Sequence, residues 1–191
     1  MNLEMAATDE MIALARQVRP QDVCLVPEKR TEVTTEGGLD VAGQKARLTE
    51  CCAALRDCGI RVSMFIDPDP EQVDAAARLG AEMMEINTRA YAETAPRSPD
   101  LGGAAVKQEL AKAAAADGGM FAAGAAERGA SHGLKILAGH GLTYRNVTLI
   151  SNIPEIEELN IGHNIIARAA LVGMERAVRE MLLAMGRQIN W

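Results

Sequence analysis

The chain has 191 residues, a formal net charge of −6 at pH 7 and 48% hydrophobic residues, which suits one globular domain and excludes wholesale disorder. The aromatic content of 3% and the negative charge argue against a broad nucleic-acid-binding surface, because such surfaces need exposed aromatic rings or basic patches. No apolar run is long enough to cross a bilayer and the N-terminus lacks the basic start of a signal peptide, so we expect a cytoplasmic protein with no membrane partner.

In the first half of the chain, short apolar runs alternate with segments of helical periodicity. Each predicted helix is followed by a stop signal, which is Pro20, Gly59 or Gly80. A polar loop is expected over residues 28–43. Strands are predicted at residues 1–5, 23–26 and 60–66, and helices at residues 8–18, 44–58 and 67–79.

The second half continues the alternation. Residues 87–103 contain two prolines and two glycines and predict a loop. One long final helix is expected to begin after residue 164 and to reach about residue 185. Strands are predicted at residues 81–86, 134–138 and 158–161, and further helices at residues 104–116, 120–127 and 145–152.

This order amounts to six strand–helix (βα) units, which favours a parallel sheet with helical crossovers. A TIM-type (β/α)8 barrel uses about 31 residues per unit, so six units need about 190 residues. The length therefore fits a single domain over residues 1–191 that is an α/β barrel, incomplete with about six βα units. It fits equally well an open, doubly wound sheet with all its strands.

Two of the three histidines directly follow predicted strands. His140 is next to Gly141, and His163 is next to Gly162, at the strand ends where barrel active sites lie. A glycine-rich turn that opens a helix presents free N–H groups to an anion, so both turns predict phosphate binding. The alternative for each is a loop histidine that caps a helix. His132 precedes its strand, which assigns it to the opposite, stabilising end.

Glu4 and Glu85 lie within apolar predicted strands. Burial of a carboxylate is costly, and it raises the pKa toward the range that general acid–base chemistry uses. The period of two places Glu85 on the same side as Met83, and the alternative for each glutamate is a solvent-facing position. The four cysteines and three histidines have no metal-ligand spacing, so we interpret the cysteines as core residues and expect no metal.

Four segments are distinctive when they are taken together. They are Met1-Asn-Leu-Glu-Met-Ala, Leu25-Val-Pro-Glu-Lys-Arg-Thr-Glu-Val-Thr-Thr-Glu-Gly-Gly-Leu-Asp-Val, Ala138-Gly-His-Gly-Leu-Thr-Tyr and Glu158-Leu-Asn-Ile-Gly-His-Asn-Ile-Ile-Ala-Arg-Ala. In this order, over essentially the whole chain, they resemble the pyridoxine 5′-phosphate synthase family, and the second segment is the most specific.

The resemblance implies a (β/α)8 barrel, a homo-octamer and a reaction between two phosphorylated small molecules. The family condenses 1-deoxy-D-xylulose 5-phosphate with 3-amino-2-oxopropyl phosphate to pyridoxine 5′-phosphate, a transferase reaction in vitamin B6 biosynthesis. The family needs no organic cofactor and no metal, so the resemblance implies none here. Imine formation, dehydration and ring closure all need proton transfers, which acid–base side chains supply.

The resemblance also implies roles for seven residues, three in the chemistry and four in substrate binding. Glu4 would be a proton acceptor, His140 a proton donor and Glu85 a stabiliser of charge in the transition state. Thr34 would contact the pentulose phosphate, and Gly141, Gly162 and His163 would bind the amino-ketone phosphate.

The chain departs from the family pattern in three places. Family members begin with two further βα units, which carry another catalytic histidine. This chain has Asn87-Thr88-Arg89 where the family tends to have His-Thr-Gly, and residues 96–103 look like an insertion. Because six strands cannot close an eight-stranded barrel, we hypothesise a truncated chain that is unstable or catalytically impaired.

Two other interpretations remain open. One is a different barrel enzyme for phosphorylated sugars, such as an epimerase or an aldolase. An aldolase would need a Schiff-base lysine, and Lys135 lies at the wrong end of its strand. The other is a non-catalytic barrel remnant that is stable only with a partner chain.

Overall fold

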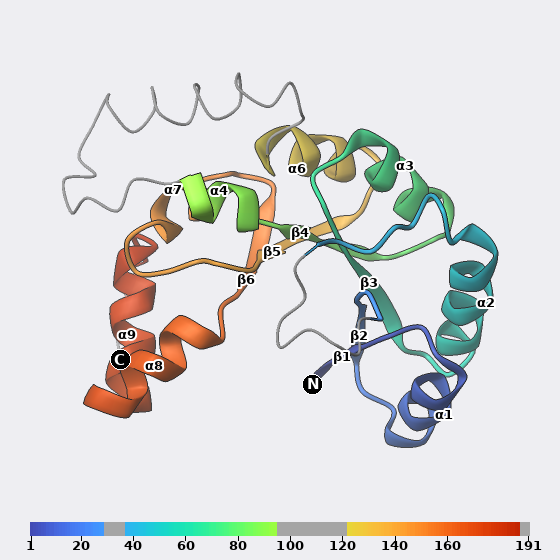
Figure 1. The fold of residues 1–191 in the computed structure, drawn as a ribbon, viewed down its shortest axis with the longest axis horizontal. Coiled ribbons are helices and arrows are strands. Elements are labelled where there is room, and N and C mark those ends of the chain that lie inside the picture. The colour runs from blue at the N-terminus through green and yellow to red at the C-terminus, as the bar shows by residue number, and fades with distance from the viewer. Residues whose placement is uncertain (29–36, 95–121, 188–191) are drawn as a thin grey trace.

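The computed structural model describes residues 1–28, 37–94 and 122–187 (Figure 1). Thr34, the helix predicted at residues 104–116 and the 96–103 insertion lie outside these residues. The strands are β1 Asn2–Met5, β2 Asp22–Leu25, β3 Arg61–Ile66, β4 Met83–Asn87, β5 Lys135–Gly139 and β6 Ile156–Asn160. The helices are α1 Asp9–Val18, α2 Lys45–Arg56, α3 Pro70–Arg78, α4 Arg89–Thr94, α6 Ala122–Ser131, α7 Val147–Ser151, α8 His163–Val172 and α9 Met174–Ala184.

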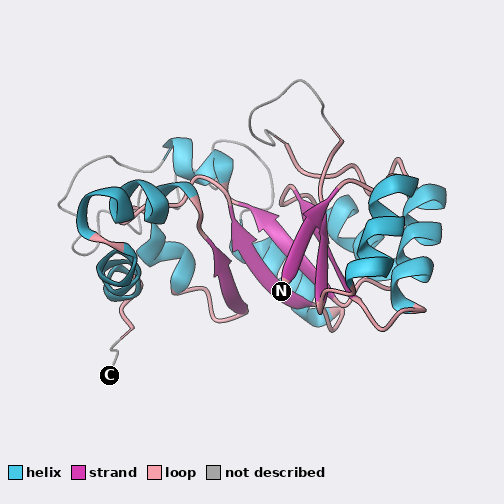
Figure 2. Ribbon diagram, turned by 90° about the horizontal axis from the view of Figure 1, so that it is seen from below, coloured by secondary structure: helices cyan, strands magenta, loops and turns pink. Residues whose placement is uncertain are grey.

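The described strands form one six-stranded sheet in which every strand pairs in parallel with the next strand of the sequence. A doubly wound sheet would reverse its strand order at a switch point, so that interpretation is wrong. Helices lie outside the strands in both views (Figures 1 and 2). The fold is therefore an incomplete TIM-type α/β barrel, as the barrel interpretation predicted.

Helices α1, α2 and α3 have the capping residues that the sequence predicted. The Thr8 side chain accepts a hydrogen bond from the N–H of Met11, and the Asp69 side chain accepts one from the N–H of Glu71. Such N-caps satisfy backbone donors that have no partner inside the helix. Gly59 follows α2 with φ +74°, a left-handed conformation that suits glycine.

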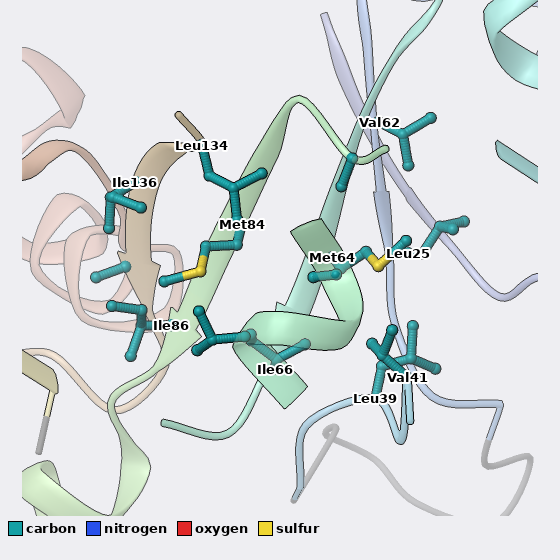
Figure 3. Close-up of a cluster of buried hydrophobic side chains, with 14 of the residues drawn as sticks. Leu25, Leu39, Val41, Val62, Met64, Ile66, Met84, Ile86, Leu134 and Ile136 are labelled. Atoms are coloured by element: carbon teal, nitrogen blue, oxygen red, sulfur yellow. The ribbon is translucent and has the colours of Figure 1, made fainter. Parts of the chain in front are cut away.

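Alternate residues of each strand face the helices and form the hydrophobic core (Figure 3). The helices complete this layer with residues such as Leu48 and Leu55 of α2 and Val73 of α3, which are fully buried. The intervening strand residues therefore face the other side of the sheet, which we call the inner face. The labelled core residues of the strands are Leu25, Val62, Met64, Ile66, Met84, Ile86 and Ile136 (Figure 3).

Two sequence predictions are corrected. The single final helix is two helices, α8 and α9, because Gly173 between them has φ +85° and ψ +155°, a conformation essentially restricted to glycine. The loop predicted at residues 87–103 begins with helix α4 instead. Among the described residues, no helix is both long enough and apolar enough to span a membrane.

Candidate active site

The strand registers place five chemically distinctive residues on the inner face. Glu4 pairs with Cys24 across β1 and β2. Glu85 lies between Phe65 and Leu137 on the neighbouring strands. Gly139 at the end of β5 pairs with Asn160 at the end of β6. Neither Cys24 nor Glu85 belongs to the helix-facing core, although both are buried.

A cavity of about 1120 Å³ opens at the carboxyl ends of the strands. Its walls come from the inner face of the sheet, from the turn after β5 and from the start of α8. The predicted site residues in its lining are Glu4, Glu85, His140, Gly141, Gly162 and His163. Thr34, the remaining predicted residue, lies outside the described part of the chain. Further lining residues include Asn2, Phe65, Asn160 and Asn164.

Glu85 is the most buried carboxyl group of this cavity, with 4% of the residue exposed. Burial raises its pKa to about 7, and the nearby charge of Glu4 acts in the same direction. Two hydrogen bonds to Oε2 oppose this shift, one from Nδ2 of Asn160 at 2.8 Å and one from Sγ of Cys24 at 3.6 Å. Glu85 can therefore exchange a proton near neutral pH, as a general acid or base must.

The Cys24 thiol supports this arrangement as a neutral group. Burial raises its pKa well above the ordinary value, and the neighbouring charges of Glu85 and Glu4 raise it further. A protonated thiol is a weak hydrogen-bond donor, so Cys24 offers a hydrogen to the carboxylate rather than a second negative charge. The sequence interpretation of Cys24 as a core residue identified its burial and missed this contact.

His140 follows β5 with a backbone conformation that is unusual for a residue other than glycine. Its φ is +80°, and Gly141 follows with φ +76°. Thr88 secures this turn: its hydroxyl lies 2.7 Å from both the Gly139 and the His140 carbonyl oxygens, and its N–H donates to Gly139 at 2.8 Å. Strained backbone of this kind concentrates at functional sites, which supports His140 as a functional residue.

The His140 ring lies in a partly apolar, positively charged environment. The Phe65 ring is 6.1 Å from it, centroid to centroid, at an interplanar angle of 50°. Partial burial lowers the pKa of His140, and the charges of Arg89 and His163 lower it further. Arg89 stands where the family tends to have glycine, so this departure from the family pattern adds a positive charge that lowers the pKa of His140. The neutral imidazole is favoured, and it can accept or donate a proton through its two nitrogens.

The start of α8 forms the side of the cavity that suits an anion. Gly162 is the N-cap of this helix and makes no side-chain capping bond, so the first N–H groups of the helix have no capping side chain. Nothing lies within 4 Å of the position that a Cβ of Gly162 would take, so a ligand can approach the backbone. A helix N-terminus that also presents His163 can hold a phosphate group.

The other charged residues weighed from the sequence lie away from this cavity. His132, just before β5, contacts Asp74 of α3 at 3.0 Å and belongs to the opposite end of the strands, as predicted. Lys135 at the start of β5 contacts Glu158 at 3.3 Å. Within the described residues, no three His, Cys, Asp or Glu side chains lie together as metal ligands would.

Sequence reasoning missed three residues that shape the site: Asn160, Thr88 and Phe65. Asn160 ends the strand before Gly162, and alternation from Glu158 would have placed it on the inner face. Phe65 occupies an alternate position in the clearest predicted strand. No sequence signal marked Thr88 as the partner of the turn after β5, because these segments are 51 residues apart.

The family model "Pyridoxal phosphate biosynthesis protein PdxJ" matches residues 1–187. The pyridoxine 5′-phosphate synthase of Synechococcus sp. (strain JA-2-3B'a(2-13)) is 52% identical over 97% of this chain and 72% of its own length. That of Magnetococcus marinus (strain ATCC BAA-1437 / JCM 17883 / MC-1) is 50% identical over 94% of this chain and 68% of its own length.

Solved structures of low sequence identity share the fold. The citrate synthase SbnG superposes with a TM-score of 0.52 at 10% identity, over 97% of this chain and 72% of that one. An HpcH/HpaI aldolase from Desulfitobacterium hafniense DCB-2 gives a TM-score of 0.51 at 14% identity, over 97% and 73% of the two chains. At such identities the likeness concerns the barrel architecture alone.

Proposed function

Because this chain belongs to the PdxJ family of pyridoxal phosphate biosynthesis proteins, we propose that it is a pyridoxine 5′-phosphate synthase. In this proposal it condenses 1-deoxy-D-xylulose 5-phosphate with 3-amino-2-oxopropyl phosphate, which makes it a transferase. The names of both relatives, pyridoxine 5′-phosphate synthase, support this product. The acid–base groups and the anion-binding helix end of the cavity support the proposal independently.

Three side chains would take part in the chemistry, two by moving protons and one by stabilising charge. Glu4, on the edge strand, would accept a proton, and His140 would donate one. Glu85 would stabilise positive charge that develops on the substrate, because its carboxylate lies in a buried place where electrostatic interactions are strong. A condensation that forms an imine, loses water and closes a ring needs such groups on more than one side of the substrate.

The phosphate group of the amino ketone would bind at the turns after β5 and β6. Gly141 and Gly162 let the ligand approach the backbone, and His163 at the start of α8 would supply a side-chain contact. Thr34 would contact the phosphate of the pentulose, by resemblance to the family alone.

A single observation carries the proposal: Glu4, Glu85, His140 and His163 line one cavity, although they come from four separate strand–helix units. Acid–base groups and an anion site must share one space for a substrate to meet both. A barrel remnant without a catalytic role would not need a buried glutamate with a pKa raised to about 7 in the same cavity as a histidine whose pKa burial lowers.

The test is an assay of the purified chain with both substrates, in which product formation is followed by chromatography. We expect slow but measurable turnover in the wild type, because the six described strands leave the barrel incomplete. Relative to that rate, kcat should fall about a hundredfold or more for His140→Asn and for Glu85→Gln. Asp57→Asn, at an exposed position after α2, serves as the control and should leave turnover unchanged. A folded wild-type chain that binds both phosphates and forms no product would refute the proposal and favour the remnant.

A further inference from the structure

Asn160 and Glu85 meet on the inner face although 75 positions separate them in the sequence. Nδ2 of Asn160 donates to Oε2 of Glu85 at 2.8 Å, and Sγ of Cys24 lies 3.6 Å from the same oxygen. Asn160 also lines the cavity, just before the turn that opens α8. One residue therefore connects the buried carboxylate with the anion-binding end of the site.

The other oxygen of Glu85 is confined by Gly139. A Cβ on Gly139 would lie 2.3 Å from Oε1 of Glu85 and 2.9 Å from the backbone carbonyl oxygen of Asn160. Only glycine leaves this space, because atoms that are not bonded cannot approach so closely. Gly139, Asn160 and Cys24 together hold the carboxylate from three strands, and Asn160 is the strongest hydrogen-bond donor among them.

We propose that Asn160 is a positioning residue: it fixes the carboxylate of Glu85 in the cavity and stabilises its ionised form. The role of Asn160 in catalysis rests on the proposed function, whereas its hydrogen bond to Glu85 is independent of that function. An amide suits this task because it donates a hydrogen bond to the carboxylate without adding a charge of its own. The Asn160 amide stays in place while the substrate reacts, as preorganised active sites require.

Several titratable groups act on Glu85 together with Asn160. Glu4 on β1 and Glu158 on β6 disfavour a second negative charge, and Cys24 on β2 contributes a weak donor. The neighbouring strands β3 and β5 contribute Phe65 and Leu137 in register, neither of which is charged. His140 lines the same cavity. Among these groups Asn160 is the uncharged donor that favours ionisation most.

Titration of Glu85 by carbon-13 NMR tests the proposal without any substrate. The signal of its carboxyl group is assigned by its disappearance in Glu85→Gln. In Asn160→Leu we expect the midpoint to rise by about one pH unit, since the ionised form loses its nearest donor. Asn160→Asp keeps the shape and adds a carboxyl group, so the midpoint should rise at least as far.

The matched control is Asn152→Leu, the same substitution at an exposed position after α7, which should leave the midpoint unchanged. An unchanged midpoint in both Asn160 variants would overturn the proposal. If the Asn160 variants do not fold, a titration of the wild-type protein tests the proposal instead. The side-chain amide signal of Asn160 is expected to shift with the same midpoint as the Glu85 carboxyl, and a constant signal would contradict the contact.

Kinetics test the positioning role separately. Asn160→Leu should lower kcat about tenfold while KM for each substrate changes less than about twofold, and the pH profile should move with the Glu85 midpoint. An unaltered kcat and pH profile would remove the positioning role. A wild-type chain without turnover would refute the proposed function, and the titrations would still decide the Asn160 contact.

Discussion

The carboxyl group of Glu85 is buried, which opposes its ionisation, and it accepts two hydrogen bonds, which favour ionisation. Because burial dominates, the pKa of the folded state, about 7, exceeds the ordinary value of 4.5. The carboxylate of Glu85 therefore binds its proton more tightly in the folded protein than in the unfolded chain. A contribution of this sign is fully present below the ordinary pKa and is lost as the pH rises through the folded-state value.

We predict that Glu85 makes the free energy of unfolding depend on pH, and the variant Glu85→Gln separates this contribution from that of other groups. Glu85→Gln stays neutral and keeps the shape of the protonated side chain. We expect the free energy of unfolding of the wild type, relative to this variant, to fall by up to about 3 kcal/mol as the pH rises from 4.5 to 7. Urea denaturation across this range measures the difference, and parallel curves for the two proteins would contradict the prediction.

Thr88 predicts a second effect at the scale of one residue. Its buried hydroxyl is the side-chain donor to the carbonyl groups of Gly139 and His140, where the backbone is strained. Thr88→Val keeps the volume and removes the hydroxyl, so we expect a loss of about 1–3 kcal/mol in the free energy of unfolding. Thr88→Ser keeps the hydroxyl and is the control, with a loss clearly smaller than that of valine. A loss for serine that equals or exceeds the loss for valine would contradict a stabilising role of the hydroxyl.

At the scale of elements, α3 and α6 are joined by charged side chains on the outer surface. Arg128 of α6 donates two hydrogen bonds to the carboxylate of Asp74 in α3, from Nε at 2.6 Å and from Nη2 at 2.7 Å. Nε2 of His132, just after α6, lies 3.0 Å from Oδ1 of Asp74. The hydrogen bonds from Arg128, and then from His132, hold the pKa of Asp74 far below its ordinary value. This contact fixes neighbouring helices over adjacent strands.

The Asp74 contact predicts an acid-sensitive contribution to stability. A carboxyl group with a lowered pKa stabilises the fold above its unfolded-state pKa and loses this effect as the pH falls. Asp74→Asn should therefore be less stable than the wild type at neutral pH, and the gap should narrow below the ordinary value of 3.8. Denaturation at both pH values measures this, with exposed Asp57→Asn as the control. A gap that stays constant would contradict the assignment to Asp74.

At the scale of the whole molecule, apolar side chains are exposed next to both edges of the sheet. β1 and β6 are the edge strands. Met1 precedes β1, and the other exposed residues lie on the helices that follow these two strands. A sheet edge with adjacent apolar surface favours association with other chains. The exposed large hydrophobic residues in the described part of the chain are Met1, Leu14, Val18, Ile166, Leu171, Met174, Val178 and Leu183.

This surface predicts binding of a hydrophobic dye such as anilinonaphthalene sulfonate by the folded chain. Leu171 and Leu183 are 80% and 64% exposed. The double substitution to glutamine should reduce dye fluorescence and change the free energy of unfolding by less than about 1 kcal/mol, because surface substitutions are nearly neutral. Undiminished fluorescence would place the dye elsewhere. Sedimentation velocity on the same proteins tests the homo-octamer that the family resemblance predicts.

Much of the fold and the site followed from local patterns. Buried strands and capped helices are encoded by residues close in sequence, such as Thr8 before α1 and Asp69 before α3. The period of two in a strand predicted that Glu85 shares a side with Met83, and the register shows that this side is the inner face. The positions of His140 and His163 directly after predicted strands indicated that both belong to one end of the sheet, and both line the cavity. The single final helix was wrong, because apolar periodicity is uninterrupted at Gly173 and only its backbone conformation ends α8.

The sequence by itself determined the order of the six strands, the family and which residues could carry protons, since these depend on neighbouring residues and their periodicity. The tertiary structure alone decided that the strands pair in chain order, which distinguishes a barrel from a doubly wound sheet. It also decided that Asn160 binds Glu85 and that Thr88 secures the turn at His140. Such contacts join residues 75 and 52 positions apart, and no local pattern specifies them, because only the parallel pairing of β4 with β5 and of β5 with β6 brings these residues together.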